Sequence, residues 1–213
     1  MDHRERWASL HAADGRWIPP EPLPAATMVL RRAGRVLLMR RSETMGFAPG
    51  MHVFPGGGLA PVDLEADDPL RACAVRETLE EVDILVEECI LFDRWITPES
   101  ERRRYDVSFY VADVLDEGRL VTSEAVSMVW IDPLSALELH ARGEFAMLRP
   151  TAVILEDLAA GRVRHDATIV IPKLPRLRPD GAWDVVNAVT EEVLATVDLG
   201  PTIAEADGAS LVD

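Results

Sequence analysis

The segment that most restricts how this chain can fold is residues 69–82, "PLRACAVRETLEEV", which follows the glycine run Gly56–Gly58. Asp68 and Pro69 predict a helix start, because an aspartate side chain accepts hydrogen bonds at the N-cap and proline suits the first helical position. We expect this helix to reach about residue 82 and to face the core with the apolar residues that recur at helical spacing, Ala72, Val75, Leu79 and Val82. One side of the helix is therefore apolar, and the other side gathers charge.

The charged side carries three glutamates, Glu77, Glu80 and Glu81, which fall within an arc of about 100° at helical geometry. Neighbouring carboxylates repel unless water, a cation or an arginine offsets their charge, and Arg76 can neutralise one of them. Carboxylate oxygens suit Mg²⁺ or Mn²⁺, and a glycine run lets backbone approach a phosphate or metal closely. Two interpretations stay open: an ordinary solvated helix face, or a metal site for hydrolysis of a phosphate anhydride.

The remaining pattern mixes strands and helices. A hairpin is expected around Gly34, and a short strand, "MHVF", should be broken by Pro55–Gly58. Further strands are expected at 107–111, 125–131 and 166–172, and further helices from Asp132-Pro133 to about His140 and from Arg149 to Gly161. Because strands and helices do not alternate regularly, we expect an α+β fold around a mixed β-sheet.

Three regions are expected along the chain. Residues 1–24 form an N-terminal extension that closes on the proline-rich "WIPPEPLP", which favours extended backbone. Residues 25–161 form the main domain. Residues 162–213 form a C-terminal extension that packs on this domain, and its acidic tail after Val197 should be loosely held.

Charge and composition limit the partners. With 22 basic and 37 acidic residues the 213-residue chain has a formal net charge of −15, which argues against a nucleic-acid-binding surface. No apolar run reaches the roughly 18 residues of a membrane span, and two cysteines do not make a disulfide framework, so we expect a cytoplasmic protein. An anionic substrate would need local positive charge, which metal ions would supply. Whether the chain forms a homodimer stays open.

The glycine at 57 followed by "RETLEEVDI" (residues 76–84) resembles the box of the Nudix hydrolases, G-x5-E-x7-R-E-U-x-E-E-x-G-U. The chain departs from this box in three places. Arg76 lies 19 positions after Gly57 where the box has 14, which is an insertion of five. Asp83 replaces the late glycine, and the early glutamate has only acidic stand-ins: Asp63, Glu65 or Asp68.

The resemblance implies a Nudix fold, an α/β/α sandwich around a mixed sheet, with Mg²⁺ or Mn²⁺ as cofactor. It also implies hydrolysis of a nucleoside diphosphate linked to another group. By this resemblance Glu80 and Glu81 bind metal with the Gly57 carbonyl, and Glu77 ligates metal or serves as the base. Arg76 would orient the glutamates by ion pairing.

A second resemblance concerns the substrate. Residues 37–57, "LLMRRSETMGFAPGMHVFPGG", are similar to the signature of coenzyme A-cleaving Nudix enzymes, L-L-T-x-R-[SA]-x3-R-x3-G-x3-F-P-G-G, with Met39 and Gly46 replacing a threonine and an arginine. This implies cleavage of coenzyme A or acyl-CoA to adenosine 3′,5′-bisphosphate and a 4′-phosphopantetheine derivative. Arg41, Gly56 and Gly57 are the expected substrate contacts.

Several alternatives stay open. Arg41 is either an exposed strand end or a phosphate contact, and Glu124 is either an exposed loop carboxylate or an extra acidic ligand or base. The loss of an arginine at Gly46 favours NADH, ADP-ribose or another nucleoside diphosphate derivative as the substrate. A non-catalytic, ligand-sensing Nudix domain is the alternative of another class.

Overall fold

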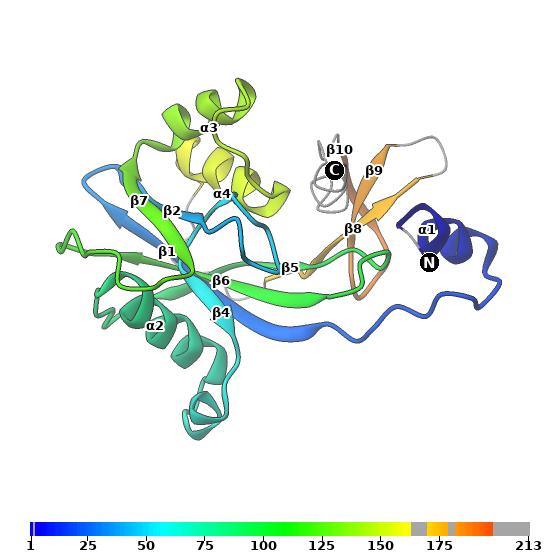
Figure 1. Cartoon of the computed structure of the whole chain (residues 1–213), viewed down its shortest axis with the longest axis horizontal. Helices are drawn as coiled ribbons and strands as arrows, with labels where there is room; N and C mark the ends of the chain where they lie inside the picture. Colours follow the sequence, from blue (N-terminus) through cyan, green and yellow to red (C-terminus); the bar gives the residue numbers. More distant parts are fainter. Residues whose placement is uncertain (2, 163–169, 179–181, 198–213) are drawn as a thin grey trace. The chain divides into compact units, whose positions relative to one another are not determined.

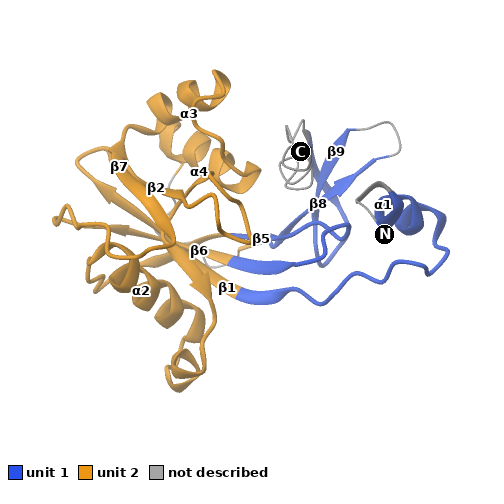
Figure 2. Ribbon diagram, viewed as in Figure 1, with its two compact units in different colours: residues 1–24, 94–107, 171–213 blue, residues 25–93, 108–170 orange. Residues whose placement is uncertain are grey.

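The computed structural model describes residues 1, 3–162, 170–178 and 182–197, and it divides into two compact units (Figure 2). Unit 1 comprises Met1–Pro24, Arg94–Val107 and Ile171–Asp213, and unit 2 comprises Ala25–Asp93 and Ser108–Val170. Three strands have residues in both units: β1 (Leu23–Arg32), β5 (Ile90–Ile96) and β6 (Tyr105–Asp113). All residues of the predicted metal and substrate site belong to unit 2.

The sheet of unit 2 is built around β1 and β2 (Arg35–Arg41), the predicted hairpin. Gly34 takes a φ of 77° in its turn, a conformation that glycine adopts without steric cost. On its other side β2 pairs with β7 (Ala125–Ile131). Near the end of β2, Met39 and Arg40 also pair with β3 (His52–Val53), on the side opposite β7. The predicted strand at 125–131 is thus confirmed.

Helices cover this sheet on both sides, as the α/β/α prediction requires (Figure 1). The helix α2 (Pro69–Val82) lies on one side, and α3 (Pro133–Ala141) and α4 (Arg149–Ala159) lie on the other. Both predicted aspartate caps are present: Asp68 accepts a hydrogen bond from the Arg71 amide at 3.1 Å, and Asp132 accepts one from the Ser135 amide at 2.9 Å. Local capping signals therefore placed these helix starts correctly.

The buried side of α2 differs from the predicted side. Leu79 is 45% exposed, whereas the buried residues are Cys73, Ala74, Thr78, Glu81 and Val82. The apolar repeat misplaced this side because Glu77 and Glu81 turn inward toward the backbone of Gly56 and Gly57. Small side chains at Cys73 and Ala74 let the helix approach the sheet closely enough for this contact.

The glycine run was predicted only in part: β3 ends at Val53, before Pro55, as expected, but a further strand follows. Gly56–Gly58 does not simply break a strand but forms one, β4, which pairs antiparallel with β1 in the register Ala26 opposite Gly57. Glycine is a poor strand former, and it is found in strands where another group approaches the backbone closely. A glycine strand beside a helix that carries carboxylates is such a place.

Unit 1 contains α1 (His3–Ala12) and the antiparallel strands β8 (Lys173–Leu177), β9 (Trp183–Asn187) and β10 (Val193–Val197). Trp95 of β5 pairs in parallel with Lys173, so the sheet is mixed, as predicted. The strand expected at 166–172 falls mostly outside the described residues, and β8 begins after it; the acidic tail after Val197 also lies outside them. No helix in the described ranges is long and apolar enough to span a membrane.

Candidate metal and diphosphate site

Two glycines of β4 let carboxylates of α2 come against the strand. The Gly56 amide donates a hydrogen bond to Oε2 of Glu81 at 2.9 Å. A Cβ on Gly57 would lie 2.5 Å from Cδ of Glu77, which is far inside contact distance, whereas a Cβ on Gly58 would meet no atom within 4 Å. A side chain at Gly57 would therefore displace the Glu77 carboxylate, whereas one at Gly58 would not.

Glu81 is a buried carboxylate, only 4% exposed. Burial raises its pKa, the Gly56 hydrogen bond opposes this rise, and the charge of Glu77 adds to it, so that the pKa is about 7. Burial likewise raises the pKa of Glu77, and the Arg76 hydrogen bond opposes this rise. The fold thus holds two acids in surroundings that disfavour their negative charge.

Arg76 is the cation at the centre of this acidic group. Its Nη1 donates to Oε1 of Glu77 at 2.8 Å and to Oε2 of Glu80 at 3.2 Å. Its Nε and Nη2 donate to the two carboxylate oxygens of Asp63 at 3.0 and 2.9 Å. One guanidinium therefore orients three carboxylates, and the ion pairing expected of Arg76 with the glutamates is present.

Asp63 fills the place for which the sequence offered three acids. It lies in a short 3₁₀ helix, Pro61–Glu65, and is buried. The bidentate bond from Arg76 holds the pKa of Asp63 below its usual value. Of the other two acids, Asp68 caps α2 and Glu65 is exposed. Asp63 also lies six positions after Gly57, which is the spacing of the early glutamate in the Nudix box, so the insertion of five follows it.

Asp83 occupies the position of the late glycine of the box. It ends α2 with φ 57° and ψ 37°, the left-handed conformation that favours glycine and that aspartate tolerates. The following chain secures this helix end: the Arg119 amide donates to the Val82 carbonyl and the Val121 amide to the Glu81 carbonyl, each at 2.9 Å. Asp83 therefore ends the helix in a conformation that a glycine at this position would adopt without steric cost.

The glutamates converge only in part. Glu80 is 58% exposed at its side chain and bonds Arg76, and Glu81 turns to β4. Within the described ranges no three acidic, histidine or cysteine side chains already stand close enough together to hold a metal ion. The donor set nevertheless fits a hard divalent cation, since it consists of carboxylates, two of which carry raised pKa values that a nearby cation would relieve.

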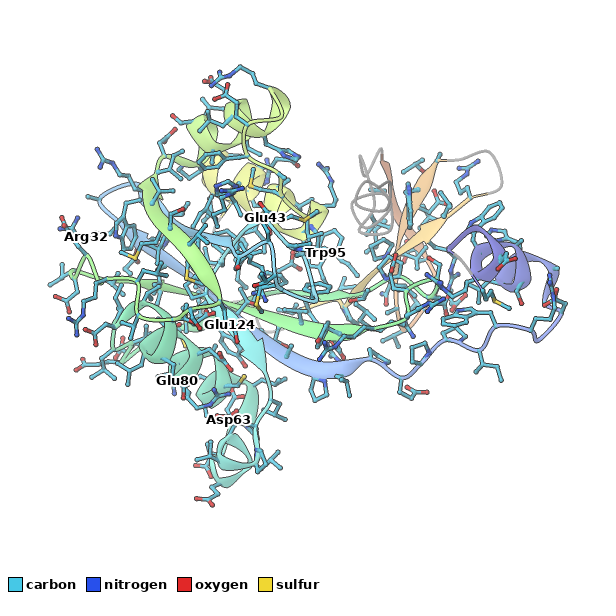
Figure 3. The ribbon with its side chains drawn as sticks, viewed as in Figure 1. Arg32, Glu43, Asp63, Glu80, Trp95 and Glu124 are labelled. Carbon is cyan, nitrogen blue, oxygen red and sulfur yellow. The ribbon has the colours of Figure 1, made fainter. Side chains whose placement is uncertain are left out.

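Glu124 and Arg41 border this group. Oε2 of Glu124 lies 3.7 Å from Nη2 of Arg41, and the charge of Glu124 raises the pKa of both Glu77 and Glu81. Figure 3 labels Glu124, which directly precedes β7, together with Glu80 of α2 and Asp63 of the 3₁₀ helix. The structure thus brings together most residues singled out from the sequence, and it adds Asp63, which only the spacing from Gly57 distinguished in advance.

The fold is that of the Nudix class, and comparisons with known proteins agree. The chain belongs to the Nudix family: the model of the NUDIX domain matches residues 20–151. It is 28% identical over 176 residues to a Caenorhabditis elegans protein named "Putative nudix hydrolase 7", a match that covers 63% of this chain and 60% of that protein.

Solved structures show the same fold. A crystal structure of a NUDIX hydrolase from Alicyclobacillus acidocaldarius matches with a TM-score of 0.63 and 26% identity, over 70% of this chain and 97% of that chain. The NUDIX domain of Shewanella oneidensis NrtR, crystallised with ADP ribose, matches with a TM-score of 0.52 and 15% identity, over 71% and 97%. The predicted Nudix fold is therefore confirmed.

Proposed function

We propose that this chain is a metal-dependent hydrolase that cuts the diphosphate linkage of coenzyme A or acyl-CoA. The observation that carries the hydrolase part is the pair of inward-facing carboxylates, Glu77 and Glu81, set against the glycine strand β4. Buried acids that repel each other favour a bound cation, and diphosphate substrates bring the negative charge that such a cation offsets. The net charge of −15 makes this local compensation necessary.

In this proposal Glu80 and Glu81 hold Mg²⁺ or Mn²⁺, with Glu77 and the Gly57 carbonyl as further ligands. When bound, the cation lowers the pKa of a water molecule and offsets charge on the leaving phosphate. Glu77 or Glu124 accepts the proton of the attacking water as the P–O bond of the diphosphate breaks. Arg76 keeps the glutamates oriented through its bonds to Asp63 and Glu77.

The coenzyme A part rests on residues 37–57, whose signature positions have defined places in the structure. Leu37, Leu38 and Phe54 are core residues, while Gly56 and Gly57 form β4 at the carboxylates. Gly50 takes a φ of 66° in the loop before β3. The signature thus describes the segment that leads from Arg41 at the end of β2 into the glycine strand, where Gly56 and Gly57 are the proposed substrate contacts.

A second substrate class is favoured by Gly46. This glycine stands where the signature has an arginine, and a Cβ there would meet no atom within 4 Å. The loop therefore lacks one cation for a phosphate of coenzyme A, so NADH or ADP-ribose is the alternative substrate. The NrtR domain that shares the fold was crystallised with ADP ribose.

A substrate panel tests both parts. Purified protein is incubated with coenzyme A, acetyl-CoA, a long-chain acyl-CoA, NADH and ADP-ribose in Mg²⁺ or Mn²⁺, and the products are separated. We expect adenosine 3′,5′-bisphosphate from the coenzyme A compounds, and a loss of about 100-fold or more in Glu80→Gln and Glu81→Gln. Cleavage of NADH or ADP-ribose alone would overturn the coenzyme A part. No cleavage of any compound would support the ligand-sensing alternative instead. Full activity in both variants would show that Glu80 and Glu81 are not the ligands of a catalytic cation.

A further inference from the structure

Arg41, at the end of β2, has its guanidinium engaged within the protein. Its Nε donates a hydrogen bond to the Phe47 carbonyl at 3.0 Å, and its Nη2 lies 3.7 Å from Oε2 of Glu124. The side chain is only 13% exposed. One guanidinium therefore links the loop of residues 42–51, named here the β2–β3 loop, to the segment that precedes β7.

The backbone around Arg41 joins the same two segments. The Arg41 amide donates to the Met51 carbonyl at 2.9 Å, and the Ser42 amide donates to the Glu124 carbonyl at 2.8 Å. The register between β2 and β7 shifts between Arg40 and Arg41. Such irregularities re-aim a side chain next to a site, and here the side chain turns toward the loop and Glu124.

Glu124 needs this support more than Glu77 and Glu81 do, because these two acids of α2 are far less exposed. Its side chain is 54% exposed, and a long, exposed side chain loses conformational freedom when it is held in one place. Its charge nevertheless acts on Glu77 and Glu81, and the charge of Arg41 acts on Glu81 in the opposite direction. The Arg41–Glu124 pair thus lies within electrostatic reach of the carboxylate group.

We propose that Arg41 is a positioning residue that holds Glu124 toward the acidic face of α2 and ties the β2–β3 loop to the same end of β2. The proposal rests on the proposed function, because Glu124 matters only if this site hydrolyses a diphosphate. In this proposal the main role of Arg41 is to position Glu124 and the loop, and not to contact a phosphate directly. A planar guanidinium suits the task, since it can donate to a carbonyl and a carboxylate at once, which an ammonium group does less well.

A double-mutant cycle tests the proposal on the full chain, with the diphosphate compound that the wild type cleaves best. The variants are Arg41→Gln, Glu124→Gln and the double mutant, with Arg41→Lys in case Arg41→Gln does not fold. We expect Arg41→Gln to lower kcat about 10-fold with KM within about 2-fold, and Arg41→Lys to recover part of this loss. The double mutant should be no slower than Glu124→Gln within about 2-fold, because the two residues act as a unit.

A phosphate contact predicts the opposite pattern. A raised KM in Arg41→Gln, with losses that multiply in the double mutant, would overturn the proposal. The control is Arg35→Gln, which removes one exposed positive charge from the other end of β2 and should leave kcat and KM unchanged.

A second readout does not depend on activity. Hydrogen exchange in the metal-free protein should become faster across residues 42–51 in Arg41→Gln and stay unchanged in Arg35→Gln. Equal exchange of this loop in wild type and Arg41→Gln would contradict the proposal. If the wild type cleaves nothing, the proposed function fails, while the exchange experiment still decides whether Arg41 ties the loop.

Discussion

Two regions that meet at the carboxylate site are built in different ways. The glycine strand β4 and α2 form the first region, where a backbone amide bonds Glu81 and a missing Cβ makes room for Glu77. The β2–β3 loop forms the second, where the side chain of Arg41 reaches a carbonyl and an exposed carboxylate. Backbone geometry tolerates less variation than surface side-chain contacts. The difference indicates that the chemistry is constrained more tightly than the choice of substrate.

The largest expected effect is the loss of activity when a methyl group is added at Gly57 in the first region; the same addition in the second region should have little effect. Gly57→Ala should lower activity about 100-fold, because its Cβ would displace the Glu77 carboxylate, and a misplacement of about 1 Å can cost that much. Steady-state kinetics on the best substrate measures the loss. Gly58→Ala, in the same strand, and Gly46→Ala, in the loop, should each stay within about 3-fold of wild type, since their Cβ atoms meet nothing within 4 Å. Equal losses in all three variants would remove the distinction between the regions.

The next largest effect is on stability and concerns Asp63, which binds Arg76 beside the first region. Asp63→Asn should destabilise the protein by about 2 kcal/mol at pH 7, because a buried carboxylate that receives two bonds from Arg76 becomes neutral. The folded-state pKa of Asp63 lies below its usual value of 3.8, so this contribution is present above about pH 4. It should be lost as the pH falls through the lower folded-state pKa.

Urea unfolding of wild type and Asp63→Asn between pH 3 and pH 7 measures this difference. Glu65→Gln, which changes an exposed acid two residues away, is the matched control and should unfold like wild type throughout. A difference between Asp63→Asn and wild type that does not depend on pH would show that the charge of Asp63 is not what stabilises Arg76.

The smallest expected effect is on stability and concerns Asp83, which replaces the late glycine of the Nudix box. Asp83→Gly should stabilise the protein by roughly 0.5–1 kcal/mol, because a residue in the left-handed conformation at φ 57° gives way to glycine. The ion pair lost with Arg119 is exposed and contributes little. The denaturation midpoint of Asp83→Gly should rise, and a lower midpoint would show that the Arg119 pair outweighs the backbone strain.

The sequence predicted the fold well where the signals are local. Asp68 and Asp132 marked helix starts, and Gly34 marked the hairpin, because capping and turn chemistry act over a few residues. The pairing of Arg76 with Glu80 followed from their four-residue spacing on the helix in the same way. These features needed no knowledge of how distant segments pack.

The features missed from the sequence depend on distant partners. Gly56–Gly58 becomes a strand because β1 pairs with it, against the low strand propensity of glycine. Glu81 is buried because β4 offers an amide, although the apolar repeat of α2 places the core side elsewhere. The sequence left Asp63, Glu65 and Asp68 open as stand-ins for the early glutamate, and the contact with Arg76, made across 13 positions, singles out Asp63.

The central claim is that the inward-facing carboxylates of α2 form a divalent-cation site, and Mn²⁺ binding to the wild type and Glu81→Gln tests it most directly. Burial raises the pKa of Glu81 to about 7 in the absence of a cation, so a proton and Mn²⁺ compete for this carboxylate. The wild type should therefore bind Mn²⁺ about 10-fold more tightly at pH 8 than at pH 6. Glu81→Gln keeps an oxygen acceptor for the Gly56 amide, but it should bind at least about 10-fold more weakly at pH 8 and with little pH dependence. Equal Mn²⁺ affinity of the two proteins at pH 8 would contradict the claim.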